Sequence, residues 1–126
     1  MNTEPHNSLP DVTLEQLPAQ LREAAARVGW TTLMPVQARA IPYLLASRNM
    51  MIQARTGSGK TGAFLLPMLE RLDAQRKHCQ ALILVPTREL ARQVWQEAET
   101  ICGGAGFRTV AVYGGVGYGA QLDALR

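Results

Sequence analysis

The chain lacks any hydrophobic run approaching the roughly 20 residues that a bilayer-spanning helix needs, so no membrane partner is expected. Residues 1–12 lack the basic and apolar regions of a signal peptide, and we expect them to form a flexible tail. There is no CxxC spacing and no histidine cluster, which argues against a zinc site or a disulfide framework. Cys79 and Cys102 are expected to be buried, reduced thiols. Together these absences favour a cytoplasmic protein.

Neither sign of charge dominates the composition. Thirteen lysine and arginine residues face ten acidic residues, which gives a net charge of +3. So mild an excess is compatible with a nucleic-acid partner but does not identify one. The length of 126 residues and the hydrophobic content of 47% suit one small domain, which we assign to residues 13–126.

Local signals predict five helices. Thr13 and Gln16 fit a capping box, apolar residues follow at helical spacing, and Gly29 is a plausible stop. Pro35 suits the first turn of the next helix, whereas Pro42 is expected to kink or split it. The segments expected to be helical are 13–28, 35–46, 60–72, 87–102 and 119–126.

Three apolar runs, at 50–53, 81–85 and 109–113, predict strands between these helices. The run at 81–85 does not alternate with polar residues, which is typical of a strand covered on both faces. Strands alternating with helices predict an α/β fold with a parallel sheet flanked by helices and right-handed crossovers.

Residues 54–61, Ala-Arg-Thr-Gly-Ser-Gly-Lys-Thr, match the Walker A phosphate loop except for alanine at the first glycine position. Gly57 and Gly59 allow the backbone to turn its N–H groups toward a phosphate. A helix beginning near Lys60 adds free amides and a positive dipole. The Lys60 ammonium can reach the β- and γ-phosphates, and the Thr61 hydroxyl can ligate Mg²⁺. The loop therefore predicts a site for ATP and Mg²⁺.

With three further elements, this loop resembles the DEAD-box ATP-dependent RNA helicase family, in which alanine is usual at that first position. Residues 86–91, Pro-Thr-Arg-Glu-Leu-Ala, resemble motif Ia, and Gly114-Gly115 resembles the GG element. Residues 29–37 resemble the adenine-recognising Q motif. The resemblance covers residues 12–126. It implies the N-terminal portion of the first RecA-like P-loop domain, truncated after its third strand, in an enzyme that unwinds RNA duplexes using ATP hydrolysis.

The resemblance also implies roles for individual residues. Trp30 would stack on adenine, and Gln37 would bind the base edge through its amide donor and acceptor. The residues themselves leave core packing open for Trp30, a solvated helix position for Gln37 and a surface position for Arg55. The ATP-binding set is Trp30, Gln37, Arg55, Thr56, Gly57, Ser58, Gly59, Lys60 and Thr61, with Lys60 and Thr61 as the catalytic residues and Thr61 as the metal ligand.

Thr87 and Arg88 follow the end of an expected strand, where open α/β sheets bind ligands. A hydroxyl and a guanidinium both suit a phosphate backbone. The RNA-binding set implied by the resemblance is Pro86, Thr87, Arg88, Gly114 and Gly115. Simple helix capping by Thr87, solvated positions for Arg88 and Arg92, and a plain turn at the two glycines remain open.

The sequence departs from the family pattern at Leu33-Met34, where proline and serine or threonine are usual, and at Val12, where an aromatic residue is usual. Looser adenine binding is the expected consequence. Asp-Glu-Ala-Asp and Ser-Ala-Thr are absent, so we expect a fragment that does not hydrolyse ATP alone. An unpaired sheet edge would promote self-association. A DNA helicase of the same superfamily and a catalytically dead nucleotide-binding or scaffold module remain alternatives.

Overall fold

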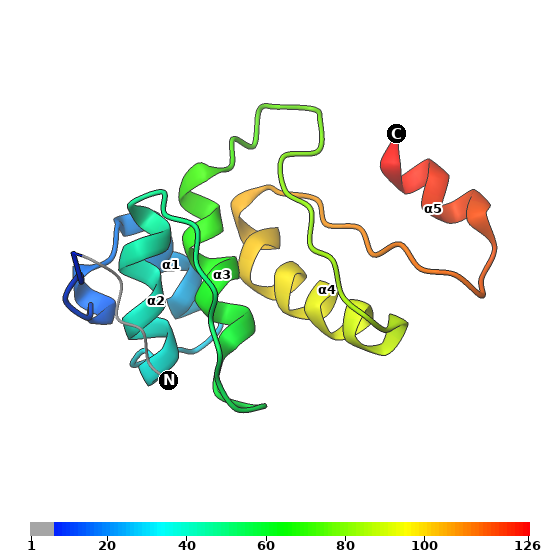
Figure 1. Cartoon of the computed structure of the whole chain (residues 1–126). Coiled ribbons are helices and arrows are strands. Elements are labelled where there is room, and N and C mark those ends of the chain that lie inside the picture. The colour runs from blue at the N-terminus through cyan, green and yellow to red at the C-terminus, as the bar shows by residue number, and fades with distance from the viewer. Residues whose placement is uncertain (1–6) are drawn as a thin grey trace. The chain divides into compact units, whose positions relative to one another are not determined.

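A computed structural model of the chain describes residues 7–126, which form helices joined by irregular segments (Figure 1). The α-helices are α1 (Ala19–Arg27), α2 (Pro35–Leu45), α3 (Lys60–Met68), α4 (Arg88–Cys102) and α5 (Tyr118–Leu125). Short 3-10 helices are η1 (Leu14–Gln16), η2 (Leu69–Arg71) and η3 (Gly103–Ala105). The chain divides into two compact units, the first ending at Arg71 and the second beginning at Leu72.

The expectation of an α/β fold with a parallel sheet is wrong, because residues 7–126 contain no strand. A strand requires a hydrogen-bonded ladder with a neighbour. Within the described chain, no backbone–backbone hydrogen bond involves the segments 50–53, 81–85 or 109–113. The apolar run at 81–85 predicted a covered strand, but Leu82 and Leu84 are 78% and 84% exposed. An apolar sequence does not by itself place a second segment beside it for backbone hydrogen bonding, and without such a segment no strand forms.

The single helix expected over 13–28 is divided into η1 and α1. Gln16 Oε1 accepts a hydrogen bond from the backbone N of Thr13 at 2.9 Å, as the capping pattern predicted. The break follows at Leu17, whose extended backbone (φ −72°, ψ 153°) is the conformation favoured before a proline. The chain leaves α1 through Gly29, which has a φ of 78°, so the predicted stop is confirmed.

Helix α2 begins at Pro35 as predicted and continues past Pro42 to Leu45 without splitting. A proline inside a helix lacks the N–H that would bond the carbonyl four residues earlier, here that of Ala38. The backbone N of Val12 donates to this carbonyl oxygen instead, at 3.1 Å. The segment before η1 therefore supplies the hydrogen bond that Pro42 cannot, which explains why the expected interruption is absent.

The first unit packs α1, α2 and α3 together (Figure 1). Its fully buried large side chains are Leu21, Ile41, Leu65, Leu66 and Leu69. Residues 7–12 are hydrogen-bonded to α2, where Tyr43 Oη accepts from the backbone N of Leu9 at 2.9 Å. Asp11 pairs with Arg39 at 3.2 Å. Residues 1–6 of the expected tail lie outside the described residues.

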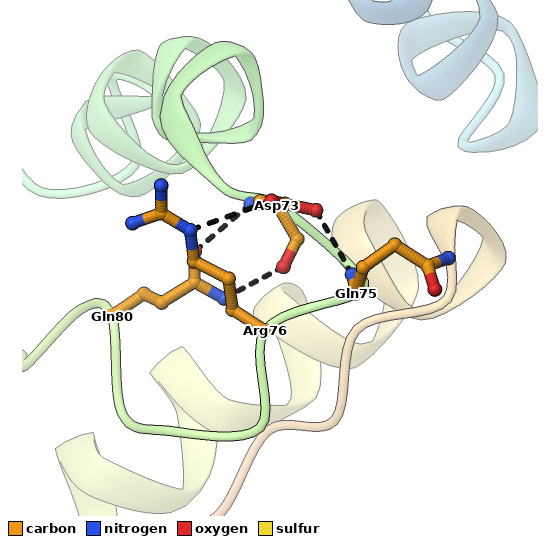
Figure 2. Close-up of polar contacts among 4 residues, drawn as sticks. All are labelled: Asp73, Gln75, Arg76 and Gln80. Atoms are coloured by element: carbon orange, nitrogen blue, oxygen red, sulfur yellow. Dashed lines mark hydrogen bonds and ion pairs between the residues drawn. The ribbon is translucent and has the colours of Figure 1, made fainter.

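The second unit begins with a loop that its own side chains close (Figure 2). The Gln80 amide pairs with both backbone groups of Asp73: Oε1 accepts from N and Nε2 donates to O, each at 2.9 Å. The Asp73 carboxylate accepts from the backbone N of Gln75 at 3.0 Å and lies 3.4 Å from Arg76 Nε. Helix α4 follows where it was predicted, whereas α5 begins at Tyr118, one residue earlier than expected.

The two cysteines differ in exposure. Cys102 is buried as predicted, but Cys79 is exposed, so the prediction of two buried thiols is wrong for Cys79. No disulfide joins them. Within residues 7–126, no helix has the length and apolar content to cross a membrane.

Candidate functional site

The loop at 54–61 turns back on itself immediately before α3. The backbone N of Ser58 donates to the carbonyl oxygen of Arg55 at 3.1 Å, which closes the turn. Gly59 occupies the N-cap position of α3 with φ 89° and ψ 20°, a left-handed conformation in which a side chain is strained. The loop therefore leads directly into the first turn of α3, where the backbone amides have no partner within the helix.

Lys60 and Ser58 are the polar side chains of greatest interest in this loop. The Lys60 ammonium donates to the carbonyl oxygen of Ala54 and so bridges the two ends of the loop. The Ser58 hydroxyl oxygen is buried and has no hydrogen-bond partner among the described residues. A buried hydroxyl without a partner is uncommon and costs free energy.

Gln37, at the start of α2, is bonded to this loop through its side chain. It is the one buried polar residue among those described, at 3% exposure. Its Oε1 accepts from the backbone N of Met34 at 2.9 Å, and its Nε2 donates to the carbonyl oxygen of Gly59 at 3.2 Å. The amide therefore connects the N-terminus of α2 to the N-terminus of α3.

The approach of Gln37 to the loop depends on the missing side chain at Gly59. A Cβ there would lie 2.7 Å from Gln37 Nε2 and 2.7 Å from Met34 Sδ. Met34 thus reaches the loop with its thioether. Two side chains of the 29–37 segment consequently contact the same glycine.

Trp30 lies against α3 one turn further along. A Cβ at Gly62 would lie 2.4 Å from Trp30 Cη2 and 2.9 Å from Cζ2, so the indole ring lies directly on the helix backbone. The same Cβ would lie 2.9 Å from Gln37 Nε2. The structure therefore brings Trp30 and Gln37 together beside residues 59–62, whereas Arg55 and Thr56 are exposed.

The expected RNA-binding residues belong to the second unit. Thr87 caps α4, its Oγ1 accepting from the backbone N of Leu90 at 3.2 Å, as the capping alternative predicted. Arg88 reaches the glycine pair, because a Cβ at Gly115 would lie 2.7 Å from Arg88 Nη1. Glu89 lies 3.4 Å from Arg88 Nε. The structure thus brings Arg88 and Gly115 together and leaves Pro86 and Gly114 exposed.

Sequence reasoning missed a second arginine contact beside this pair. Arg92 Nε donates to the Tyr113 hydroxyl at 3.0 Å, and the guanidinium carbon lies 5.4 Å from the centre of the ring. This hydrogen bond raises the pKa of Arg92 above its ordinary value. The available signal was the spacing of Arg88 and Arg92, which puts both on one face of α4.

No cluster of three or more histidine, cysteine, aspartate or glutamate residues that could hold a metal ion occurs in residues 7–126.

Comparison with known proteins adds an independent finding. Residues 34–126 match the family described as DEAD/DEAH box helicase. The chain is 48% identical over 112 residues to the ATP-dependent RNA helicase DeaD of Escherichia coli, covering 87% of this chain and 18% of the relative. It is 44% identical over 111 residues to DeaD of Haemophilus influenzae, again covering 87% and 18%. The chain thus spans about a fifth of the length of these relatives.

The chain is also similar to solved structures of an RNA helicase and of a DEAD box protein. An RNA helicase from Chaetomium thermophilum bound to ADP matches with a TM-score of 0.81 and 37% identity, covering 98% of this chain and 31% of that one. A DEAD box protein from Methanococcus jannaschii matches with a TM-score of 0.78 and 32% identity, covering 92% and 33%.

Proposed function

The chain belongs to the DEAD/DEAH box helicase family, and from this premise we propose that it binds ATP at residues 54–61 and RNA around Arg88 and Gly115. Residues 13–126 then correspond to the N-terminal portion of the first helicase domain. The whole protein would use ATP binding and hydrolysis to separate RNA strands, the activity that the names of its relatives carry.

The observation that carries the ATP proposal is the convergence of Trp30 and Gln37 on residues 59–62. A nucleotide needs a base site beside its phosphate site, and these contacts join the two candidate segments directly. The Trp30 indole supplies a stacking face. The Gln37 amide has a second N–H and a second acceptor lone pair beyond the bonds it makes to the protein, which would suit the edge of adenine.

The loop residues fit a phosphate and its Mg²⁺ ion. The unpartnered Ser58 hydroxyl supports a ligand oxygen at the loop. Lys60 would exchange the carbonyl oxygen of Ala54 for phosphate oxygens, and the Thr61 hydroxyl would ligate Mg²⁺. The ion would neutralise charge on the β- and γ-phosphates. These residues hold the nucleotide but do not activate water, and the chain contains no Asp-Glu-Ala-Asp, so we propose binding without hydrolysis.

The RNA proposal depends on Arg88 and its contact with Gly115. A guanidinium offers several donors to phosphate oxygens, and a glycine leaves room for a sugar–phosphate chain to approach the backbone closely. Thr87 caps α4 and presents the free amides of its first turn next to Arg88. Contacts of this kind bind the backbone without selecting a base sequence.

We also propose a cytoplasmic location and self-association for this protein. The absence of a disulfide between Cys79 and Cys102 is typical of a reducing compartment and supports a cytoplasmic location. Leu82 and Leu84 are exposed in a segment without backbone hydrogen bonds, which supports self-association there. Such association would make the thermal transition depend on protein concentration, and a sharp, concentration-independent transition of a monomer would argue against it.

Calorimetric titration of the whole chain with Mg·ATP tests the proposed function. We expect saturable binding that is lost in Lys60→Ala and retained in Lys77→Ala, in which an exposed lysine of the second unit is removed. Equal affinities of the two variants would contradict the assignment of the loop.

A further inference from the structure

Arg92 is held in a defined orientation, which is unusual for an exposed arginine. Its Nε bonds the Tyr113 hydroxyl at 3.0 Å while the guanidinium lies over the ring. One of its five N–H donors is used in this way, which leaves the Nη groups for another acceptor. Among the residues described, no carboxylate forms an ion pair with Arg92, whereas Arg88 is paired with Glu89. The Glu89 carboxylate attracts the Arg92 guanidinium electrostatically but forms its ion pair with Arg88, so Arg92 carries an oriented charge that Glu89 offsets only in part.

Tyr113 is itself fixed by α5. The Gln121 side chain pairs with both backbone groups of Tyr113: its Oε1 accepts from N at 2.9 Å and its Nε2 donates to O at 3.1 Å. This amide makes the two bonds that a neighbouring strand would otherwise provide. Arg92 is thus held by Tyr113, and Tyr113 by Gln121, so little side-chain freedom remains to be lost when a ligand binds.

Arg88 and Arg92 approach the same short backbone segment. Arg88 Nη1 lies against Gly115 and Arg92 Nε bonds Tyr113 Oη, so both guanidinium groups lie along residues 113–115. Residues four apart on a helix are neighbours, with Cβ atoms about 5–6 Å apart. Two cations in a row along an exposed backbone segment match the repeated charge of a sugar–phosphate chain better than a single anion.

We propose that Arg92 binds a second backbone phosphate of single-stranded RNA, next to the one bound by Arg88, and that Tyr113 is the positioning residue that orients its guanidinium. This inference rests on the proposed RNA-binding function and extends it to two residues outside the elements that carry the family resemblance. Arg92 contributes affinity through charge, whereas Tyr113 contributes through orientation alone, and the two contributions respond differently to salt.

The test is fluorescence anisotropy of a labelled oligouridylate titrated with the whole chain at several KCl concentrations. Removing one phosphate contact lowers the slope of log K against log [salt] by about 0.7 for single strands. We expect Arg92→Gln to lose roughly tenfold in affinity and to lower the slope by that amount. Arg92→Lys keeps the charge, so the slope is expected to be retained while affinity falls by less.

Tyr113→Phe keeps the ring and the charge of Arg92 but removes the hydroxyl. Its affinity is expected to fall roughly two- to tenfold, as for a side chain that must be ordered on binding, with the slope unchanged. Arg22→Gln removes an exposed arginine from α1 and serves as the matched control, with slope and affinity as in the wild type.

An Arg92→Gln variant with the wild-type slope would overturn the proposal, as would an equal loss of slope in Arg22→Gln. Wild-type RNA binding that is reduced by Arg88→Gln but not by Arg92→Gln would refute this inference and leave the proposed function intact. A wild-type chain that binds no RNA at low salt would refute both.

Discussion

The side-chain amide of Gln37 donates a hydrogen bond from Nε2 to the carbonyl oxygen of Gly59, 3.2 Å away, across 22 residues of sequence. The same oxygen also accepts from the backbone N of Ala63 at 3.1 Å, in the first turn of α3. Gln37 is therefore part of the structure that shapes the loop at 54–61, in addition to its proposed contact with the base. Changes at this residue should alter both the stability of the first unit and nucleotide binding.

Gln37→Glu should destabilise the first unit. A carboxylate oxygen would replace the donor Nε2 and oppose the Gly59 carbonyl oxygen, and a lost, unsatisfied buried hydrogen bond costs about 1–3 kcal/mol. Urea unfolding followed by Trp30 fluorescence in a Trp95→Phe background measures the change. Gln20→Glu, at an exposed position of α1, is the control and should unfold with the wild-type midpoint. Equal midpoints for the two variants would mean that the Gln37–Gly59 bond contributes nothing.

Gly62→Ala should be destabilising because the new Cβ would lie 2.4 Å from Trp30 Cη2. Overpacking of this kind typically costs about 1–3 kcal/mol, and displacing the indole should also weaken ATP binding. Gly119→Ala in α5 is the matched control, since nothing lies within 4 Å of its Cβ. An alanine in a helix is favoured over glycine by roughly 0.5–1 kcal/mol, so this control should be neutral or stabilising. Thermal unfolding followed by circular dichroism distinguishes the two, and a stable Gly62→Ala protein with wild-type ATP affinity would contradict the described packing.

The helices were predictable where their signals are local. Pro35 in a first turn and Thr87 as an N-cap marked the starts of α2 and α4 because each acts within one helical turn. The continuity of α2 through Pro42 was not predictable, since it depends on Val12, which lies 30 residues away in sequence. Strands were predicted wrongly because an apolar run such as 81–85 shows only that its residues favour extended structure. A β-ladder also needs a second segment with which the backbone can pair.

In the candidate sites, too, features set by neighbouring residues could be predicted from sequence, whereas features set by long-range contacts could not. The loop at 54–61 could be proposed as a phosphate site from sequence because its glycines, lysine and threonine lie within eight consecutive residues. The contact of Trp30 with Gly62 and that of Arg88 with Gly115 depend on tertiary packing, so no local sequence pattern predicts them. Arg92 was noticed only as a solvated helix residue, because its partner Tyr113 lies 21 residues away.

Thr87→Ala should destabilise the second unit by about 1 kcal/mol, the usual effect of losing an N-cap hydroxyl. The bond at risk is the one that Oγ1 accepts from the backbone N of Leu90. Unfolding followed by Trp95 fluorescence in a Trp30→Phe background reports on the second unit, because Trp95 lies in α4 and its Nε1 donates to the carbonyl oxygen of Thr109. Thr87→Ser retains the hydroxyl and should keep most of the stability. Equal loss in both variants would indicate that the methyl group, and not the cap, matters at this position.

Adenine selectivity should be present but weak. Both ends of the Gln37 amide already bond the protein, and Leu33-Met34 replaces the usual proline and hydroxyl residue. We therefore expect the chain to bind Mg·ATP only a few-fold more tightly than Mg·GTP, the size of a single modest hydrogen bond, about 0.5–1.5 kcal/mol. Competition titrations with the two nucleotides give the ratio. Equal affinities would remove Gln37 from base recognition and leave it only its contact with Gly59.

The central claim is that one nucleotide site unites the loop at 54–61 with Gln37 and Trp30. The most direct measurement is the ¹H–¹⁵N correlation spectrum of the labelled chain during titration with Mg·ATP, which observes backbone amides, the glutamine side-chain amides and the indole N–H separately. We predict saturable shifts at Gly57 to Thr61, at the Gln37 side-chain amide and at the Trp30 indole, all absent in Lys60→Ala. Saturable shifts confined to other residues, or unchanged by Lys60→Ala, would contradict the account.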